Sequence, residues 1–213
     1  MHARMPFGYR PVRIVAFAAA LAAIPLVVAP SAHAGPLLAS VTGCRNQTME
    51  TPFLRWGDLA TYVLAPNGGA ESRSRWALTG DATVTPGNES YYVHDPDDRS
   101  ALALPAGSSA TTGAMCVHID YPTLRLVVRN TGSPLSTLLV EVLFEDPFGN
   151  VLSLPIGEVI GTSSWQPSTP LPVTANLLPL LPDDQTPVAF RFTPIGDGEW
   201  SIDDTYIDPW RHG

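Results

Sequence analysis

The sequence contains no lysine, so its twelve basic residues are all arginines, and they face twenty acidic residues. The formal net charge is −8 at neutral pH. A nucleic-acid-binding protein needs a basic patch or stripe on its surface, and this composition does not supply one. We therefore expect no nucleic-acid partner. An acidic surface suits solubility, cation binding or life outside the cell.

The chain also lacks a hydrophobic run long enough to cross a bilayer. Its longest apolar stretch covers residues 14–28 and is interrupted by Pro25. A membrane-spanning helix needs about 20 apolar residues. We therefore expect a protein that does not span a membrane.

The same stretch has the layout of a secretory signal peptide. Arg4, Arg10 and Arg13 precede it, and the small-x-small sequence Ala32-His33-Ala34 follows it. This layout predicts a signal peptide over residues 1–34, cleaved after Ala34, and a secreted, extracellular protein. The leader contains no acidic residue, so cleavage makes the remaining chain more acidic still.

Cysteine is scarce, with only Cys44 and Cys116 in the chain. In an exported protein two cysteines predict one disulfide bond. Two free buried thiols and an intermolecular bridge are the alternatives. Residues 41–44 loosely match a lipoprotein processing box, which would tether the protein to a membrane. Such a box normally ends the apolar run, and Cys44 lies well beyond it, so we favour the disulfide.

Motifs of the common enzyme classes are missing. The sequence has no zinc-ligand spacing, no Gly-x-Ser-x-Gly elbow, no phosphate loop and no dinucleotide fingerprint. His118 and Asp120 share one face of an expected strand, but no nucleophile accompanies them. We therefore interpret His118 as a hydrogen-bonding residue at a strand end, and we expect no enzymatic activity.

What the chain does contain is a hydrophobic period of two. Leu124, Leu126 and Val128 lie on one face of a run in which Arg125 and Arg129 lie on the other. This alternation is typical of antiparallel strands with one buried and one polar face. Further strands are expected over residues 59–64, 75–79, 82–85, 90–93, 100–104, 111–119, 138–145, 151–160, 190–192 and 199–210.

These strands and the Gly/Pro-rich turns between them predict an all-β fold, an antiparallel jelly-roll β-sandwich over residues 58–213. Residues 35–57 show little periodicity and are interpreted as an N-terminal tether. One short helix or helical turn is expected at residues 176–181, where Pro179 limits its length.

Two motifs resemble a known group of proteins. The closing stretch Trp200-Ser201-Ile202-Asp203-Asp204 is similar to the last strand of the galactose-binding-like jelly rolls, which include many carbohydrate-binding modules with a structural calcium. Asn67-Gly68-Gly69-Ala70-Glu71, followed by Trp76, resembles their opening, although Ala70 replaces an aromatic residue. The chain also resembles a set of secreted actinobacterial proteins.

The resemblance implies a structural calcium ion. Its ligands here would be Glu71 after the Asn-Gly turn and Asp203 or Asp204 from the last strand, because Ca²⁺ prefers several hard oxygen ligands. The alternative is that these acids are solvated or paired with arginine. Adjacent strand residues point to opposite faces, so Asp203 and Asp204 do not form a catalytic pair.

A second acidic stretch, His94-Asp95-Pro96-Asp97-Asp98, is also a cation candidate. Its acids lack the spacing of an EF-hand loop, and Pro96 is typical of an exposed turn. We favour the turn.

Aromatic residues are the candidates for ligand binding. Sugar-binding modules stack pyranose rings on exposed aromatic side chains, and Tyr91, Tyr92 and Trp165 lie in two-faced or loop-like contexts. The alternative is that these rings fill the core or seal its ends. The sequence thus favours a non-catalytic glycan-binding module, and the alternative is an extracellular structural or protein-interaction domain with no sugar site.

Five charged residues are expected on the polar faces of the strands: Arg125, Arg129, Glu141, Glu145 and Arg191. They would either line a binding groove or form cross-strand ion pairs. We favour the ion pairs, which contribute little each on a wet surface.

Overall fold

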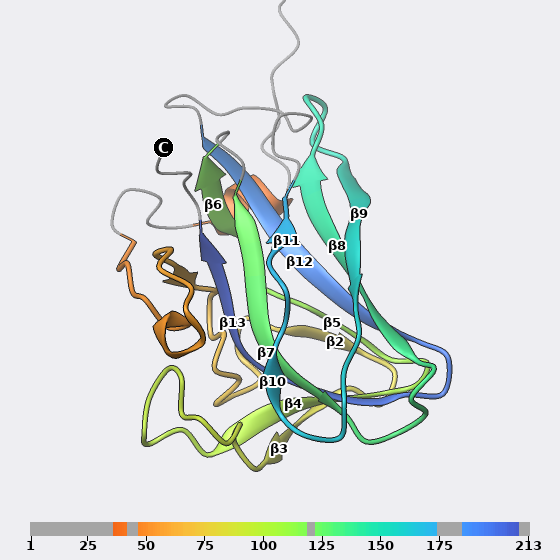
Figure 1. Cartoon of the computed structure of the whole chain (residues 1–213). Helices are drawn as coiled ribbons and strands as arrows, with labels where there is room; N and C mark the ends of the chain where they lie inside the picture. Colours follow the sequence, from red (N-terminus) through yellow and green to blue (C-terminus); the bar gives the residue numbers. More distant parts are fainter. Residues whose placement is uncertain (1–35, 42–46, 119–121, 174–184, 209–213) are drawn as a thin grey trace, which may run out of the picture. The chain divides into compact units, whose positions relative to one another are not determined.

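Two antiparallel sheets make up the part of the chain that the computed structural model describes, residues 36–41, 47–118, 122–173 and 185–208 (Figure 1). All of these residues belong to one unit, residues 32–213. The expected signal peptide and Cys44 lie outside the described residues. Among the described helices, none is long and apolar enough to cross a membrane.

The seven-stranded sheet has the order β10-β7-β13-β4-β3, with β1 paired to β13 and β11 paired to β7. The last described strand, β13, therefore lies in the middle of this sheet and not at an edge. The bounds are β1 Val63–Leu64, β3 Thr83–Pro86, β4 Ser100–Pro105, β7 Thr123–Asn130, β10 Gln166–Pro167, β11 Leu171–Pro172 and β13 Glu199–Asp208.

The six-stranded sheet has the order β2-β5-β12-β8-β9, with β6 paired to β12. At one end of this order lies β9, which contains Pro155 and pairs with β8 through a register shift between Val140 and Glu141. The bounds are β2 Ala77–Thr79, β5 Ser109–Thr111, β6 Met115–His118, β8 Thr137–Glu145, β9 Val151–Val159 and β12 Gln185–Ile195.

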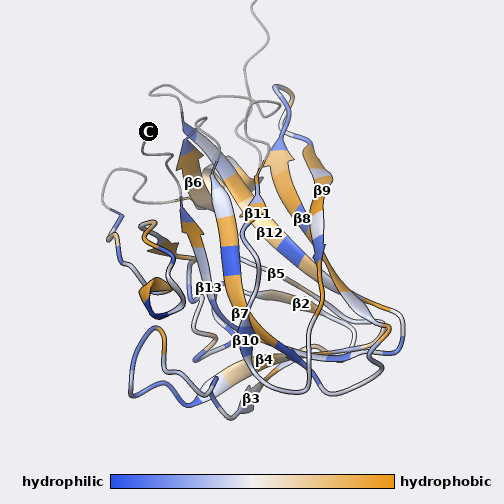
Figure 2. Ribbon diagram, viewed as in Figure 1, coloured by the Kyte–Doolittle hydropathy of each residue, from blue (hydrophilic) through white to orange (hydrophobic). Residues whose placement is uncertain are grey.

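Side chains from both sheets form the main hydrophobic core. Leu126 of β7 and Ile202 of β13 join Val140 of β8 and Phe190 of β12 in one cluster, and all four are fully buried. Figure 2 shows the alternation that produces this core, with hydrophobic and hydrophilic bands following one another along β7 and β12. The all-β antiparallel sandwich expected from the period of two is confirmed.

A second, smaller cluster covers the outer face of the seven-stranded sheet. Phe53 is fully buried in it, beside Val127 of β7 and Tyr206 of β13. The 3₁₀ turn η1, Leu54–Trp56, follows Phe53 directly, and Glu50 forms an isolated bridge with Tyr62. The stretch interpreted as a tether from the sequence thus contributes a buried side chain to the fold.

Several elements differ from those expected. The expected strand over residues 111–119 is divided between β5 and β6, and β10 and β11 are additional two-residue strands. The short helix α1, Pro36–Ser40, lies within the expected tether. The helical turn expected at residues 176–181 lies outside the described residues.

The prediction of a strand over residues 90–93 is wrong, because these residues form a turn. The carboxylate of Glu89 accepts hydrogen bonds from the backbone N–H groups of Tyr91 and Val93. One acceptor that binds two N–H groups so close together curls the chain, and Tyr92 adopts a positive φ of 51°.

Candidate functional site

The turn after β1 lies against the middle of β13, as the resemblance implied. The backbone N–H of Ala65 donates to the carbonyl of Thr205, at 2.9 Å, and the N–H of Thr205 donates to the carbonyl of Gly68, at 3.1 Å. A Cβ atom on Gly68 would lie only 2.5 Å from the Thr205 oxygen. Glycine is therefore required for this close approach.

A β-bulge in β13 determines where the two adjacent acids point. Asp203 pairs with Val127 and Tyr206 pairs with Arg125, so β13 has one residue more than β7 across this interval. Asp204 has a positive φ of 45°. A bulge breaks the regular alternation of side chains, and both aspartates become fully buried in separate environments.

Asp203 lies beside another buried acid. Its carboxylate accepts hydrogen bonds from the backbone N–H groups of Glu89 and Asp204, at 3.1 and 2.9 Å. Burial, and then the nearby charge of Asp204, raise the pKa of Asp203 to about 9. Burial also raises the pKa of Glu89. Both acids of this pair are fully buried.

Asp204 lies beside a histidine and a third aspartate. Ligand atoms of His94, Asp98 and Asp204 lie within 4.8 Å of one another. Nδ1 of His94 is 2.8 Å from Oδ2 of Asp98, and the backbone N–H of His94 donates to Oδ2 of Asp204 at 3.2 Å. Oδ1 of Asp204 is buried and has no hydrogen-bond partner within the described residues. We call these three residues the acidic cluster.

Burial dominates the electrostatics of the acidic cluster. It raises the pKa of Asp204 to about 7, with a further contribution from the charge of Glu89. Burial alone would lower the pKa of His94, but the hydrogen bond and the charge of Asp98 outweigh it, so that the pKa of His94 is raised. The arrangement has the donor atoms to bind a cation.

The calcium ligands expected from the sequence, Glu71 with Asp203 or Asp204, make different contacts in the structure. Oε1 of Glu71 accepts hydrogen bonds from the backbone N–H groups of Arg99 and Ser100, both at 2.8 Å, at the start of β4. Glu71 and Asp203 are not members of the acidic cluster, and only Asp204 of the expected set is. One carboxylate oxygen of Glu71 is occupied with the backbone. Calcium binding itself stays a prediction.

His94 and Asp98 are the residues that sequence reasoning did not connect with the last strand. The acidic stretch that contains them was a separate cation candidate. Its link to Asp204 spans 110 residues of chain and depends on the bulge. The spacing His94-x-x-x-Asp98 was the available signal.

Of the three candidate aromatic residues, one has a largely exposed side chain. Tyr92 is 50% exposed, whereas Trp165 is only 8% exposed. The guanidinium of Arg129 lies 4.7 Å from the centre of the Trp165 ring. Tyr91 packs edge-on against Trp56 and donates from its hydroxyl to the carbonyl of Trp165. Burial thus leaves Trp165 little ring surface for a sugar.

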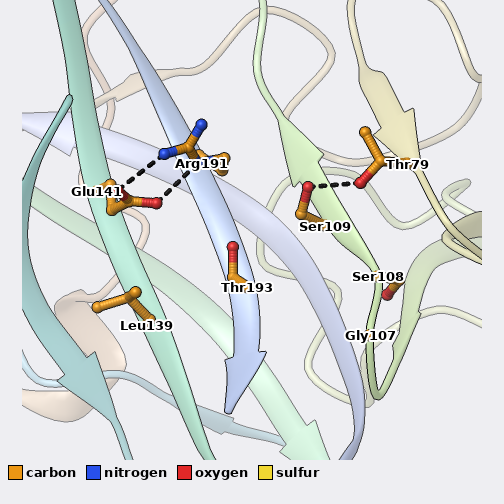
Figure 3. Close-up of a pocket in the computed structure, with 8 residues that line it drawn as sticks. All are labelled: Thr79, Gly107, Ser108, Ser109, Leu139, Glu141, Arg191 and Thr193. Carbon is orange, nitrogen blue, oxygen red and sulfur yellow. Dashed lines mark hydrogen bonds and ion pairs between the residues drawn. The ribbon is translucent and has the colours of Figure 1, made fainter. Parts of the chain in front are cut away.

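An open pocket of about 410 Å³ lies on the outer face of the six-stranded sheet. Its lining comes from β2, β5, β12 and β8 and from the turn before β5 (Figure 3). Thr79 and Ser109 are hydrogen-bonded to each other across β2 and β5, at 2.7 Å. Leu139 and Thr193 line the pocket beside them. We call this feature the sheet pocket.

A bidentate ion pair forms one side of the sheet pocket. Nε of Arg191 is 2.7 Å from Oε2 of Glu141, and Nη2 is 2.8 Å from Oε1 (Figure 3). Nη2 also donates to the hydroxyl of Ser153, at 3.3 Å. The hydrogen bond from Arg191 is the main cause that lowers the pKa of Glu141. The carboxylate is therefore ionised at neutral pH, and the pair presents both acceptors and donors to the pocket.

The other three outward charges do not join this pair in one groove. Arg125 and Arg129 belong to β7 of the other sheet, where Arg125 forms an ion pair with Asp58. Glu145 lies near the end of β8, where its carboxylate accepts a hydrogen bond from the backbone N–H of Leu37 in α1. The expected cross-strand ion pair is thus present for Glu141 and Arg191.

Two further predictions from the sequence, the disulfide and the role of His118, involve residues that the structure does not describe. Cys116 is 2% exposed in β6, but Cys44 lies outside the described residues, so the disulfide stays a prediction. His118 ends β6, as expected for a strand-end residue, and Asp120 also lies outside the described residues.

No protein-family model matches the sequence, and no curated protein matches it either. Solved structures do resemble the fold. The C-terminal family 22 carbohydrate-binding module of Clostridium thermocellum Xyn10B is 16% identical over 70% of this chain and 92% of that one, with a TM-score of 0.44. The CBM22-1 xylan-binding domain of Paenibacillus barcinonensis Xyn10C is 12% identical over 68% and 94%, with a TM-score of 0.45.

A larger protein resembles the chain over only part of its own length. The enzymatically active domain of tailspike protein 4 from bacteriophage CBA120 is 24% identical over 66% of this chain and 20% of that one, with a TM-score of 0.41. Identities and TM-scores of this size do not transfer a ligand or an activity. The two sheets are therefore the evidence for the fold, and the geometry of the candidate sites is the evidence for the proposed function.

Proposed function

We propose that the protein is a secreted, non-catalytic binding module that takes a glycan in the sheet pocket. The observation that supports this most directly is the polar lining of an open pocket on a sheet face, with a bidentate Glu141–Arg191 pair beside the hydroxyls of Thr79, Ser109 and Thr193. Sugars carry many hydroxyl groups that both donate and accept. A carboxylate accepts, a guanidinium donates in a fixed geometry, and both form strong charge-assisted hydrogen bonds.

The chemistry of the sheet pocket predicts a weak and mostly polar interaction. None of its lining residues is aromatic, so sugar stacking contributes little there. Hydrogen bonds to charged groups contribute about 1.5–3 kcal/mol each, and association itself costs several kcal/mol. After that cost is subtracted, two or three such bonds correspond to a Kd of about 1 mM or weaker.

Tyr92 is the second contact in this proposal. Its side chain is exposed enough to stack on a sugar ring, whereas Tyr91 and Trp165 support the surrounding surface through their mutual hydrogen bond. Tyr91 and Trp165 belong to the cluster on the seven-stranded sheet, and Tyr92 follows Tyr91 in the chain, whereas the sheet pocket lies on the other sheet. Tyr92 is therefore a separate contact for a long polysaccharide and not part of the pocket.

A glycan array with the purified protein tests the proposal, with xylohexaose and β-1,4-galactotriose among the probes. The strongest binder is then titrated calorimetrically against Arg191→Ala and Glu141→Gln. We expect each change to weaken binding at least about tenfold, because Arg191→Ala removes a charged donor and Glu141→Gln replaces a charged acceptor with a neutral amide. Arg99→Ala is the matched control, since its guanidinium is exposed and pairs with Asp97 outside the pocket. Unchanged affinity in both pocket variants would contradict the proposal.

The alternative is an extracellular structural or protein-interaction domain. The turn between β8 and β9 favours it, because Phe148 is 84% exposed and Leu152 and Val151 are 45% and 41% exposed nearby. Exposed apolar groups that lie together are typical of protein contacts. A protein that binds no glycan on the array, but binds an extracellular protein in a manner abolished by Phe148→Ser, would favour this function instead.

A further inference from the structure

We propose that His94, Asp98 and Asp204 bind a divalent transition-metal ion of the zinc class. The proposal is independent of glycan binding. It rests on an orphaned buried oxygen, on the convergence of three ligand atoms and on the charge that the three side chains carry, each of which is a separate observation.

The first observation is Oδ1 of Asp204. Asp204 is fully buried, and this oxygen has no hydrogen-bond partner among the described residues. A buried carboxylate oxygen without a partner is costly, because it has lost its water and gained nothing in exchange. A bound cation supplies the missing partner.

The second observation is convergence at Gly69. A Cβ atom placed on Gly69 would lie 3.2 Å from Oδ2 of Asp98, 3.3 Å from Nδ1 of His94 and 3.5 Å from Oδ1 of Asp204. The orphaned oxygen thus points to the same small space as the other two ligand atoms. Glycine leaves that space open, whereas any other residue at this position would place a carbon atom in it.

The third observation is charge. Asp98 is 6% exposed and Asp204 is fully buried, and within the described part of the chain no arginine side chain bonds to either carboxylate. Two carboxylates and one neutral imidazole match a divalent cation in charge. The ion takes the place of the proton between Nδ1 of His94 and Oδ2 of Asp98, which are now 2.8 Å apart.

The donor set identifies the class of metal. Calcium takes six to eight oxygen ligands, whereas an imidazole nitrogen with two carboxylate oxygens suits zinc and neighbouring first-row metals. Three protein ligands leave a fourth position for water. His94 is partly exposed, so the ion can reach the site from solvent.

Metal content tests the proposal directly. Protein stripped with EDTA is dialysed against equimolar Zn²⁺ or Ca²⁺, and bound metal is measured by mass spectrometry. We expect one zinc per chain and a clear preference for zinc over calcium. Co²⁺ added to the stripped protein should give visible d–d absorption, which reports ligation and not stability. Calcium bound in preference to zinc, or Co²⁺ spectra identical to those of the free ion, would overturn the proposal.

Four variants locate the metal. His94→Ala and Asp98→Asn each remove a ligand, and Gly69→Ala keeps all three ligands but places a methyl group among them. We expect each to weaken zinc binding at least about tenfold. Asp97→Asn is the matched control, because Asp97 lies in the same loop with a side chain that is 92% exposed. Circular dichroism checks that each variant folds. If His94→Ala does not fold, the other two variants, Gly69→Ala and Asp98→Asn, still test the site. Zinc bound equally by Asp98→Asn and Asp97→Asn would also overturn the proposal.

Discussion

The outer faces of the two sheets carry similar chemistry and differ in what covers them. Each has an arginine paired with a carboxylate, Arg125 with Asp58 on the seven-stranded sheet and Arg191 with Glu141 on the six-stranded sheet. The Arg125 side chain is 8% exposed and the Arg191 side chain is 35% exposed. The guanidinium of Arg125 lies 4.3 Å from the ring centre of Phe53.

The two ion pairs contain the same kinds of residue and differ in burial. Burial by neighbouring side chains therefore separates a structural ion pair from one that is a candidate for ligand binding. Under Phe53, Arg125 also donates twice to the carbonyl of Ser168, so its donors are consumed internally. On the open face, Arg191 and Glu141 border a pocket with hydroxyl groups around it. A covered pair should therefore govern stability, and an open pair should govern binding.

Removing the Phe53 ring that buries Arg125 should have the largest effect on stability. Phe53→Ala deletes a fully buried ring that packs edge-on against Tyr62 and Tyr206. We expect the free energy of unfolding to fall by about 4 kcal/mol, because such changes lose both hydrophobic burial and packing. Urea unfolding measures this. Phe148→Ala, at an 84% exposed position, should change stability little, and equal losses in the two variants would contradict the comparison.

Removing the covered arginine should have the next largest effect. Arg125→Ala removes the charged partner of the Asp58 carboxylate and the side-chain donor to the carbonyl of Ser168. We expect a loss of about 3 kcal/mol, since breaking a buried pair strands the remaining polar groups. The same unfolding experiment applies. A loss below about 1 kcal/mol, the range of exposed pairs, would show that Phe53 does not isolate this pair from water.

Removing the open arginine should affect stability least. Arg191→Ala breaks the pair with Glu141 on a partly solvated face. Exposed pairs contribute up to about 1 kcal/mol, so we expect a loss within that range, together with the loss of glycan affinity proposed above. Thermal unfolding and calorimetric titration on one preparation separate the two. A larger loss of stability than in Arg125→Ala would reverse the comparison.

The smallest expected effect is on the pKa values of the two paired carboxylates, Glu141 and Asp58, which an acid titration measures. The hydrogen bond from Arg191 lowers the pKa of Glu141 below 4.5. For Asp58, burial acts to raise the pKa, but hydrogen bonds from Ala60, Tyr62 and Arg125 outweigh it and lower the pKa below 3.8. A lowered folded-state pKa contributes stability that is present above the unfolded-state value and is lost as pH falls through the folded-state value.

Carboxyl NMR titration of the variants checks this. In Arg191→Ala, the pKa of Glu141 should rise toward its ordinary value. In Arg125→Ala, the pKa of Asp58 should also rise, because the opposing effect of burial remains. A Glu141 pKa that does not change in Arg191→Ala would show that the pair in the sheet pocket is not formed in solution.

Strands with a clean period of two were predictable from the sequence, and the site was not. Leu138, Val140 and Val142 alternate with outward residues, and β8 lies where they indicated. Residues 90–93 are rich in the aromatic and β-branched residues typical of strands, but the carboxylate of Glu89 binds the N–H groups of Tyr91 and Val93 and curls the chain. A buried acceptor that competes for backbone N–H groups leaves no periodic signal in the sequence.

The acidic cluster illustrates the same limit. The sequence indicated that the turn near Gly68 meets the last strand and that Asp204 is a candidate ligand. It did not indicate the bulge in β13 or that His94 and Asp98 approach Asp204 from a loop 110 residues earlier. Register shifts depend on both partner strands, and the sequence of one strand alone does not encode them.

The outermost strand of the six-stranded sheet has a consequence for behaviour in concentrated solution. A strand at the end of a sheet offers its outward backbone groups to other molecules, and polymeric aggregates grow by such pairing. Pro155 of β9 has no N–H group to offer, and the register shift opposite it distorts the strand locally. Intermolecular sheet extension is thus discouraged along the edge beside the sheet pocket, so that this face can stay open to solvent without recruiting another copy of the chain.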